Sequence, residues 1–262
     1  MIRACILLLI VMSFLENIQA NDTHTDTFRL ANSAFKEGSI DDAIQLYRAI
    51  ADKGYVSLPL YFNLGSAYAK KRNWTEARYY LEQAHLENPL HKDVNKNLDF
   101  VKEQIDDPYT YPKYPLFSLI ELIHSGLGRN VVSIFFLLCF LGCATSLYLR
   151  WIGQLKNKLV NWLFATFLIF FGIIMFFEQT YERFHARMVI VNLPTTNLYK
   201  IPDVEGEVAF DLQGGHKLRI QESIGPWYKV DLADGTEGWV PADHVKGLAD
   251  KYKKKVDHMI NL

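Results

Sequence analysis

Two long apolar segments constrain this chain more than any other feature of its sequence. They span Val131–Leu149 and Leu159–Phe177, and neither contains a charged residue. As a helix, each would be about 28 Å long at ~1.5 Å per residue, close to the ~30 Å hydrocarbon core of a bilayer. A helix that packs on one side of a globular domain normally carries a polar stripe. The sequence therefore predicts a hairpin of two transmembrane helices.

The short connection between these segments, residues 150–158, is basic. It contains Arg150, Lys156 and Lys158 and no acidic residue. Basic loops are retained in the cytoplasm, so we expect this loop there and both large flanking regions on the other side of the membrane.

The amino terminus has the pattern of a signal peptide. Arg3 precedes the apolar stretch Cys5–Leu15, which is too short to span a bilayer, and a small residue, Ala20, ends a candidate cleavage site. Residues 1–20 are therefore predicted to be a signal peptide; if they are retained as an anchor, the expected topology is unchanged. All three cysteines lie in apolar runs, which predicts flanking domains without disulfides.

Residues 24–105 repeat with a period of 34. The pattern of one repeat consists of Leu64-Gly65, Tyr68, Ala77, Leu81, Ala84 and Pro89. This order and spacing resemble the tetratricopeptide repeat, which implies stacked pairs of helices. Small residues at Gly65 and Ala77 are expected to let paired helices approach closely.

One repeat position is occupied by Arg29, Asn63 and Asn97, each 34 residues apart. In the tetratricopeptide family, an asparagine there often bonds the backbone of an extended peptide; the alternative is that these amides bond neighbouring backbone within the stack. Arg29 departs from the asparagine pattern and favours an acidic or carboxylate-ended ligand. The candidate partner-binding residues of this groove are Phe28, Arg29, Asn32, Phe62, Asn63, Ser66, Lys70 and Asn97.

Residues 106–130 contain three prolines before an apolar stretch. The prolines predict an extended spacer, which we prefer to a ligand for an SH3-like partner. The apolar stretch predicts a segment lying at a membrane surface. At the other end of the chain, residues 249–262 form a basic amphipathic tail, either in contact with anionic lipid or solvated.

In residues 186–248 the hydrophobic period changes to two, and turn residues separate short segments, which predicts a small β-barrel. The runs Gly225–Val230 and Asp234–Pro241, with Trp-Tyr-Lys-Val and Gly-Trp-Val, resemble the bacterial SH3 domain. The resemblance implies binding of peptide or peptidoglycan. Candidate cleft residues are Tyr199, Trp227, Tyr228 and Trp239; the alternative is that one tryptophan caps the core.

Catalysis is not expected. The eight histidines are scattered, and neither zinc-type Cys/His spacing nor a nucleophile-base pattern is present. We therefore predict no enzyme activity, no catalytic residue, no metal and no cofactor. The net charge of −1 predicts no general attraction to nucleic acid.

The order of these modules resembles the BatE family of aerotolerance proteins. The expected fold class is a multidomain membrane protein: an all-α tetratricopeptide repeat, a transmembrane hairpin and an all-β SH3-like barrel. The resemblance implies a two-pass protein of the bacterial inner membrane with both domains in the periplasm. It also implies partners among membrane or periplasmic proteins, some with von Willebrand A-type domains, in envelope or oxidative-stress maintenance. The leading hypothesis is a non-enzymatic adaptor, and the alternative is a cell-wall sensor that binds peptidoglycan.

Overall fold

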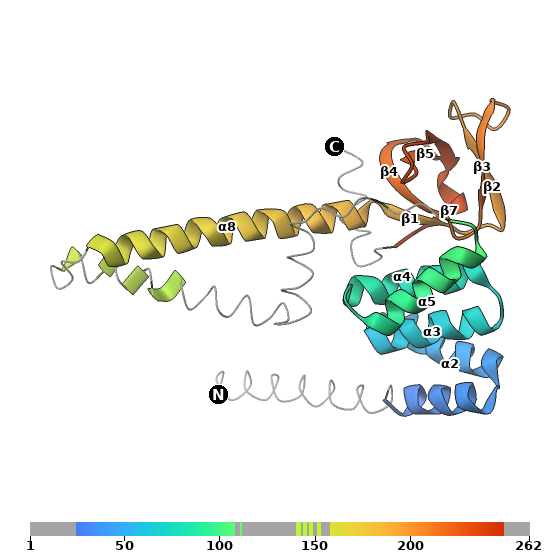
Figure 1. Ribbon diagram of the computed structural model, residues 1–262, viewed down its shortest axis with the longest axis horizontal. Coiled ribbons are helices and arrows are strands. Elements are labelled where there is room, and N and C mark those ends of the chain that lie inside the picture. The colour runs from blue at the N-terminus through green and yellow to red at the C-terminus, as the bar shows by residue number, and fades with distance from the viewer. Residues whose placement is uncertain are drawn as a thin grey trace, which may run out of the picture. The chain divides into compact units, whose positions relative to one another are not determined.

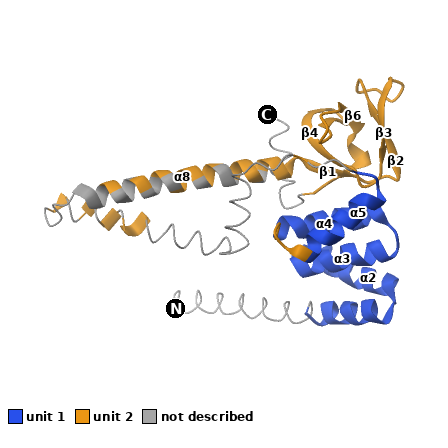
Figure 2. Cartoon of the chain, in the orientation of Figure 1, with its two compact units in different colours: residues 1–87, 93–107 blue, residues 88–92, 108–262 orange. Residues whose placement is uncertain are grey.

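The computed structural model divides the chain into two compact units (Figures 1 and 2). The first comprises Met1–Glu87 and Asp93–Asp107, and the second comprises Asn88–Lys92 and Pro108–Leu262. The predicted signal peptide, the basic tail and most of the linker lie outside the described part of the chain. The structure describes residues 25–107, 111, 140–142, 144–145, 147–148, 151–152 and 158–248.

The first unit is helical, as the 34-residue period predicts. A helix over residues 25–37 is followed by α2 (Ile40–Ala51), α3 (Leu58–Lys70), α4 (Trp74–Glu87) and α5 (Lys92–Gln104). At the start of α3, the Ser57 hydroxyl accepts a hydrogen bond from the backbone N–H of Leu60, as an N-cap residue does. Repeat residues that the pattern assigns to the helix seam are fully buried: Ala31, Ala43, Tyr47, Leu64, Ala77, Leu81 and Ala84.

The close approach of α3 and α4 depends on Gly65. A Cβ atom at this position would lie 2.6 Å from Cγ of Leu81 and 3.1 Å from its backbone nitrogen. Both distances are shorter than normal packing contacts, and one of them is to backbone, which has little freedom to move. The expectation that a small residue brings these helices together is confirmed at this position.

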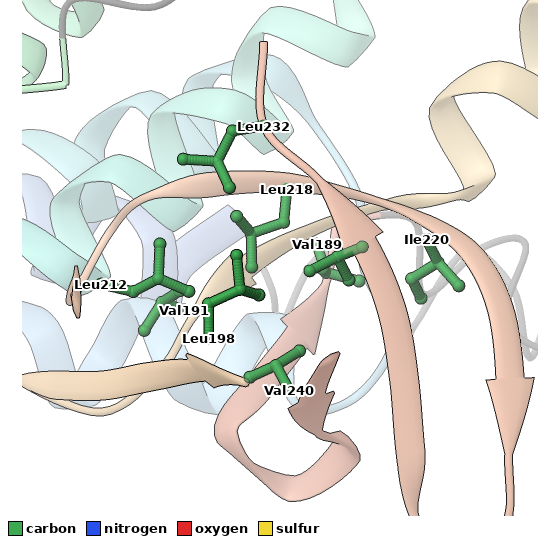
Figure 3. Packing of buried hydrophobic residues seen from close by; sticks show 9 residues of the cluster. Val189, Val191, Leu198, Leu212, Leu218, Ile220, Leu232 and Val240 are labelled. Atoms are coloured by element: carbon green, nitrogen blue, oxygen red, sulfur yellow. The ribbon is translucent and has the colours of Figure 1, made fainter. Parts of the chain in front are cut away.

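The second unit contains the long helix α8 (Lys158–Ala186) and an antiparallel sheet (Figure 1). The sheet order is β3-β2-β6-β5-β4-β1-β7. Its core consists of aliphatic side chains that alternate along the strands and point inward (Figure 3). The strands are β1 (Met188–Val191), β2 (Thr195–Tyr199), β3 (Val208–Gln213), β4 (Lys217–Ile224), β5 (Trp227–Asp231), β6 (Glu237–Pro241) and β7 (Val245–Gly247), with a 3-10 turn, η1 (Ala242–His244), before the last.

The predicted membrane hairpin is wrong. Most of the first expected span, Val131–Leu149, lies outside the described residues, and the second, Leu159–Phe177, is part of α8. Among the residues the structure describes, no helix has both the length and the apolar character needed to cross a bilayer. α8 does not end with the apolar run, but continues through Glu178 and Glu182 towards the barrel. An apolar run was thus not sufficient evidence for a span, and the two-pass inner-membrane placement that rested on it is wrong as well.

Replacing Gly65 with alanine should destabilise the helical unit by about 1–3 kcal/mol, because the new methyl group overpacks the α3–α4 seam. Thermal unfolding followed by far-UV circular dichroism would measure the effect. The matched control is Gly172→Ala in α8, where a Cβ atom meets nothing within 4 Å; this change should not lower the melting temperature. Equal melting curves for Gly65→Ala and the unaltered chain would contradict the proposed role of Gly65.

Candidate functional site

The asparagines of the helical repeat form a ladder of side-chain hydrogen bonds. Asn63 on α3 donates from Nδ2 to Oδ1 of Asn32 at 2.9 Å. Asn97 on α5 donates in the same way to Oγ of Ser66 at 3.2 Å. Donors and acceptors are each 34 residues apart, so one connection recurs along the stack. The amides therefore bond within the stack, but to neighbouring side chains rather than to the backbone that the sequence-based alternative named.

Tyr47 strengthens the first rung of this ladder. Its hydroxyl donates to Oδ1 of Asn32 at 2.6 Å, so this oxygen accepts from both Tyr47 and Asn63. Tyr47 is completely buried. Burial raises the pKa of Tyr47, which keeps the hydroxyl protonated and able to donate. Asn32 thus ties the first helix to both α2 and α3.

The other predicted groove residues lie beside the ladder without taking part in it. The ring of Phe28 contacts that of Tyr47, with centroids 5.7 Å apart, and Phe62 is half-buried. Arg29 is exposed and pairs with Asp26 at 3.1 Å. Lys70 is exposed and places Nζ 4.3 Å from the centroid of the Phe35 ring. Arg29 and Lys70 are therefore both exposed beside the ladder, where Asp26 offsets the charge of Arg29 and Lys70 supplies positive charge.

In the barrel, three of the four predicted cleft residues come together. Tyr199 on β2 pairs with Trp239 on β6, and Trp239 in turn pairs with Lys229 on β5. Directly paired residues share a face of an antiparallel sheet, and Trp227 lies two residues from Lys229 and so on the same face. The rings of Tyr199 and Trp227 meet edge to face, with centroids 5.6 Å apart. We call Tyr199, Trp227 and Trp239 the aromatic ledge.

Tyr228 does not join the ledge. It follows Trp227 directly in β5, so its side chain points to the opposite face of the strand, where it packs against the hydrophobic core. Trp227 and Trp239 are half-buried and lie outside the core cluster. The period-two alternation of the sequence was sufficient to separate Tyr228 from its neighbour.

A charge pair adjoins the ledge. Nζ of Lys229 lies 3.0 Å from Oε2 of Glu237. The hydrogen bond and the negative charge of Glu237 raise the pKa of Lys229, so the lysine is charged near neutral pH. Because the two charges offset each other locally, the ledge offers ring surfaces rather than net charge to a ligand.

Gly238 is a residue that the sequence analysis did not assign to the site. A Cβ atom there would lie 2.5 Å from Cγ of Leu198 and 2.8 Å from the carbonyl oxygen of Tyr199. The glycine thus allows β2 to lie directly against β6, which places Tyr199 next to Trp239. Its position before Trp239 in the Gly-Trp-Val motif was the available signal.

The described residues also include a hydroxyl-imidazole contact but no cluster of metal ligands. Thr196 and His244 form a hydroxyl-imidazole contact of 2.7 Å that ties β2 to η1, and Thr196 is buried, which suits a structural link. In the described part of the chain, no three side chains of histidine, cysteine, aspartate or glutamate are grouped so that they could hold a metal ion.

Comparison with known protein families identifies both domains. A model of the tetratricopeptide repeat matches residues 59–91, and a model of the bacterial SH3 domain matches residues 194–246. No curated protein matches the chain. The chain therefore contains a tetratricopeptide repeat and a bacterial SH3 domain, and these support a role in protein interaction or peptidoglycan binding.

The first rung of the ladder should tolerate a carboxylate less well than the second. In Asn63→Asp, the carboxylate meets an acceptor already used by Tyr47, which should cost about 1–3 kcal/mol of stability. In Asn97→Asp, the Ser66 hydroxyl can rotate and donate, so the loss should be smaller. Chemical denaturation of both variants at neutral pH gives the comparison. Equal losses of stability in the two variants would show that the contact with Tyr47 does not make the first rung more sensitive than the second.

Proposed function

We propose that this chain is a non-enzymatic adaptor that holds one partner on its helical repeats and another on its SH3 domain. The observation that carries the proposal is the aromatic ledge. Tyr199, Trp227 and Trp239 share one outer face, while the barrel core is built from other residues. Half-exposed aromatic side chains are common anchors in binding surfaces, since they bury a large area at small entropic cost.

The helical unit contributes a different kind of surface. The ladder uses the Nδ2 donors of Asn63 and Asn97 inside the stack, so a partner meets chiefly the side chains around it. Arg29 and Lys70 are exposed there. Lys70 favours an acidic or carboxylate-ended segment of a partner protein, and Arg29 joins it by exchanging its weak surface pair with Asp26 for a carboxylate of the partner.

The order of the two domains indicates the kind of complex in which this adaptor works. The same order resembles the BatE family, and we therefore propose a complex that maintains the cell envelope or resists oxidative stress. Proteins with von Willebrand A-type domains are the proposed partners. The proposal needs no catalytic group in this chain, because assembly of partners is its whole activity.

A cell-wall sensor is the second candidate, and the ledge favours it too. Flat aromatic rings with polar edges provide apolar surface together with hydrogen-bonding groups, which suits the alternating apolar and polar faces of glycan. In this case the SH3 domain binds peptidoglycan and the repeats pass its state to a protein partner.

Capture of partners by the full-length chain tests the adaptor. We expect cross-linking in cells to yield a specific partner that is lost with the double variant Arg29→Glu/Lys70→Glu, because its charges are reversed. The control Lys53→Glu changes an exposed lysine in the connection after α2 and should retain the partner. If all three chains capture the same proteins, the charged groove is not the docking site.

Sedimentation with purified peptidoglycan separates the two candidates. The sensor requires the full-length chain to sediment with the polymer, and Trp227→Ala should weaken that binding roughly tenfold because a stacking surface is removed. Trp74→Ala is the matched control, since Trp74 packs against Phe100 in the helical unit. Absence of sedimentation, or equal weakening by both changes, would exclude peptidoglycan as the ligand of the ledge.

A further inference from the structure

A tyrosine from the linker lies against the SH3 domain. The hydroxyl of Tyr111 donates to the backbone carbonyl oxygen of Asp231 on β5 at 2.6 Å, across 120 residues of sequence. The ring of Tyr111 also meets the ring of Phe184 on α8 edge to face, with centroids 6.4 Å apart and planes at 85°. Both the ring and the hydroxyl of Tyr111 are therefore engaged.

Arg219 on β4 organises the place where this tyrosine lies. Its guanidinium carbon is 5.6 Å from the ring centroids of both Tyr111 and Phe184, within the range of cation-π attraction. Asp231 holds the guanidinium by two contacts, one of them from Nε to Oδ1 at 3.0 Å. Such a paired contact fixes the plane of the guanidinium. The orientation of this stacking surface therefore does not depend on Tyr111.

Asp231 is itself fixed from a second direction. Nε2 of Gln221 donates to Oδ1 of Asp231 at 2.7 Å, and only 5% of Asp231 is exposed. A buried carboxylate that accepts several hydrogen bonds is held in one orientation. The group that orients Arg219 and supplies the carbonyl acceptor is thus rigid.

We propose that Phe184, Arg219 and Asp231 form a binding site for a tyrosine in an extended segment, which we call the tyrosine seat. Its ligand in this chain is Tyr111, which occupies the seat and excludes other tyrosines from it. The seat binds tyrosine in preference to phenylalanine because the tyrosine hydroxyl donates to the carbonyl oxygen of Asp231. Tyr111, which belongs to a stretch expected from its prolines to be a plain spacer, is in this view an intramolecular ligand.

Intramolecular binding explains why such a small contact can hold. Tyr111 and the seat belong to one chain, and tethering within a chain gives a segment an effective concentration on the order of 1 mM. If the separate segment bound with a dissociation constant of about 0.1 mM, the tethered one would fill the seat roughly nine-tenths of the time. The closure is therefore reversible, and a competing tyrosine-bearing segment can open it.

The seat is separate from the aromatic ledge. Trp227 and Asp231 lie on the same face of β5, four residues and about 13 Å apart. None of the contacts that form the seat involves a ledge residue. The inference therefore goes beyond the proposed function and does not depend on what the ledge binds.

The reference peptide that tests the seat has the sequence of residues 108–115 with Tyr109 and Tyr114 replaced by serine, so that Tyr111 is its only tyrosine; it is added to the full-length protein. Fluorescence anisotropy of the labelled peptide should give a dissociation constant on the order of 0.1 mM with the Tyr111→Ala chain. Binding to the unaltered chain should be about tenfold weaker, because its own linker competes. The same peptide with Tyr111→Phe should bind several-fold more weakly than the reference peptide, since it lacks one hydrogen bond. A peptide carrying Tyr111→Ala should not bind.

Two double variants locate the binding. Tyr111→Ala/Arg219→Lys keeps the charge beside Asp231 but loses the planar fork, and should weaken peptide binding about tenfold. Tyr111→Ala/Trp227→Ala alters the ledge alone and should leave binding unchanged. Thermal unfolding of each variant shows whether the barrel has folded. If the peptide binds all the folded chains equally, or binds none of them, the tyrosine seat is not a binding site.

Discussion

The close approach of backbones at two glycines is the constraint on which both units depend. At Gly65 the approach is between α3 and α4, and at Gly238 it is between β2 and β6. In each case the functional side chains are neighbours of the glycine: Asn63 lies two residues before Gly65, and Trp239 directly follows Gly238. A side chain at either glycine would push apart the elements that hold the site, so packing and site geometry have the same origin.

The asparagine ladder shows how a helical repeat can repeat a polar contact as well as an apolar one. Each rung joins the first helix of one pair to the first helix of the next, so the ladder aligns the helices that make the groove. The acceptor position of Asn32 and Ser66 is occupied by Phe100 after another 34 residues. Phe100 has no acceptor and packs its ring against Trp74. Among the described residues the ladder therefore has two rungs, and Phe100 packs back on α4 instead of accepting a third hydrogen bond.

Local periodicity predicted most of what lies within each unit. The 34-residue period indicated the helix pairs, and alternation with turn residues indicated the strands, because both patterns record which side chains face a core. The same alternation places Tyr228 inward, although it was assigned to the cleft as an aromatic residue of the Trp-Tyr-Lys-Val motif. The membrane hairpin was wrong because a charge-free run does not show where its helix ends, and α8 continues into charged residues.

Contacts between distant segments were beyond such reasoning. Nothing near Tyr111 in the sequence indicates Asp231, because the partner is chosen by the fold and the acceptor is a backbone atom that every residue has. The ladder was open to partial prediction, since the spacing of Asn63 and Asn97 marked the position. Its acceptors were less predictable because Asn32 and Ser66 share only the ability to accept a hydrogen bond.

Two arginines with buried acidic partners show how an arginine can be either a fixed part of a domain or a surface that a ring contacts. In the helical unit, Arg78 is 1% exposed and bonds Glu82 from Nε at 2.9 Å, with Asp107 at 3.5 Å. That guanidinium is enclosed. The free-energy cost of removing it from water is offset only while both carboxylates attract it. In the barrel, Asp231 is buried but the side chain of Arg219 is 29% exposed, so the acid fixes the arginine while its flat face remains available to a ring. Burying the acid and exposing the base is what turns an ordinary ion pair into a surface that an aromatic side chain can use.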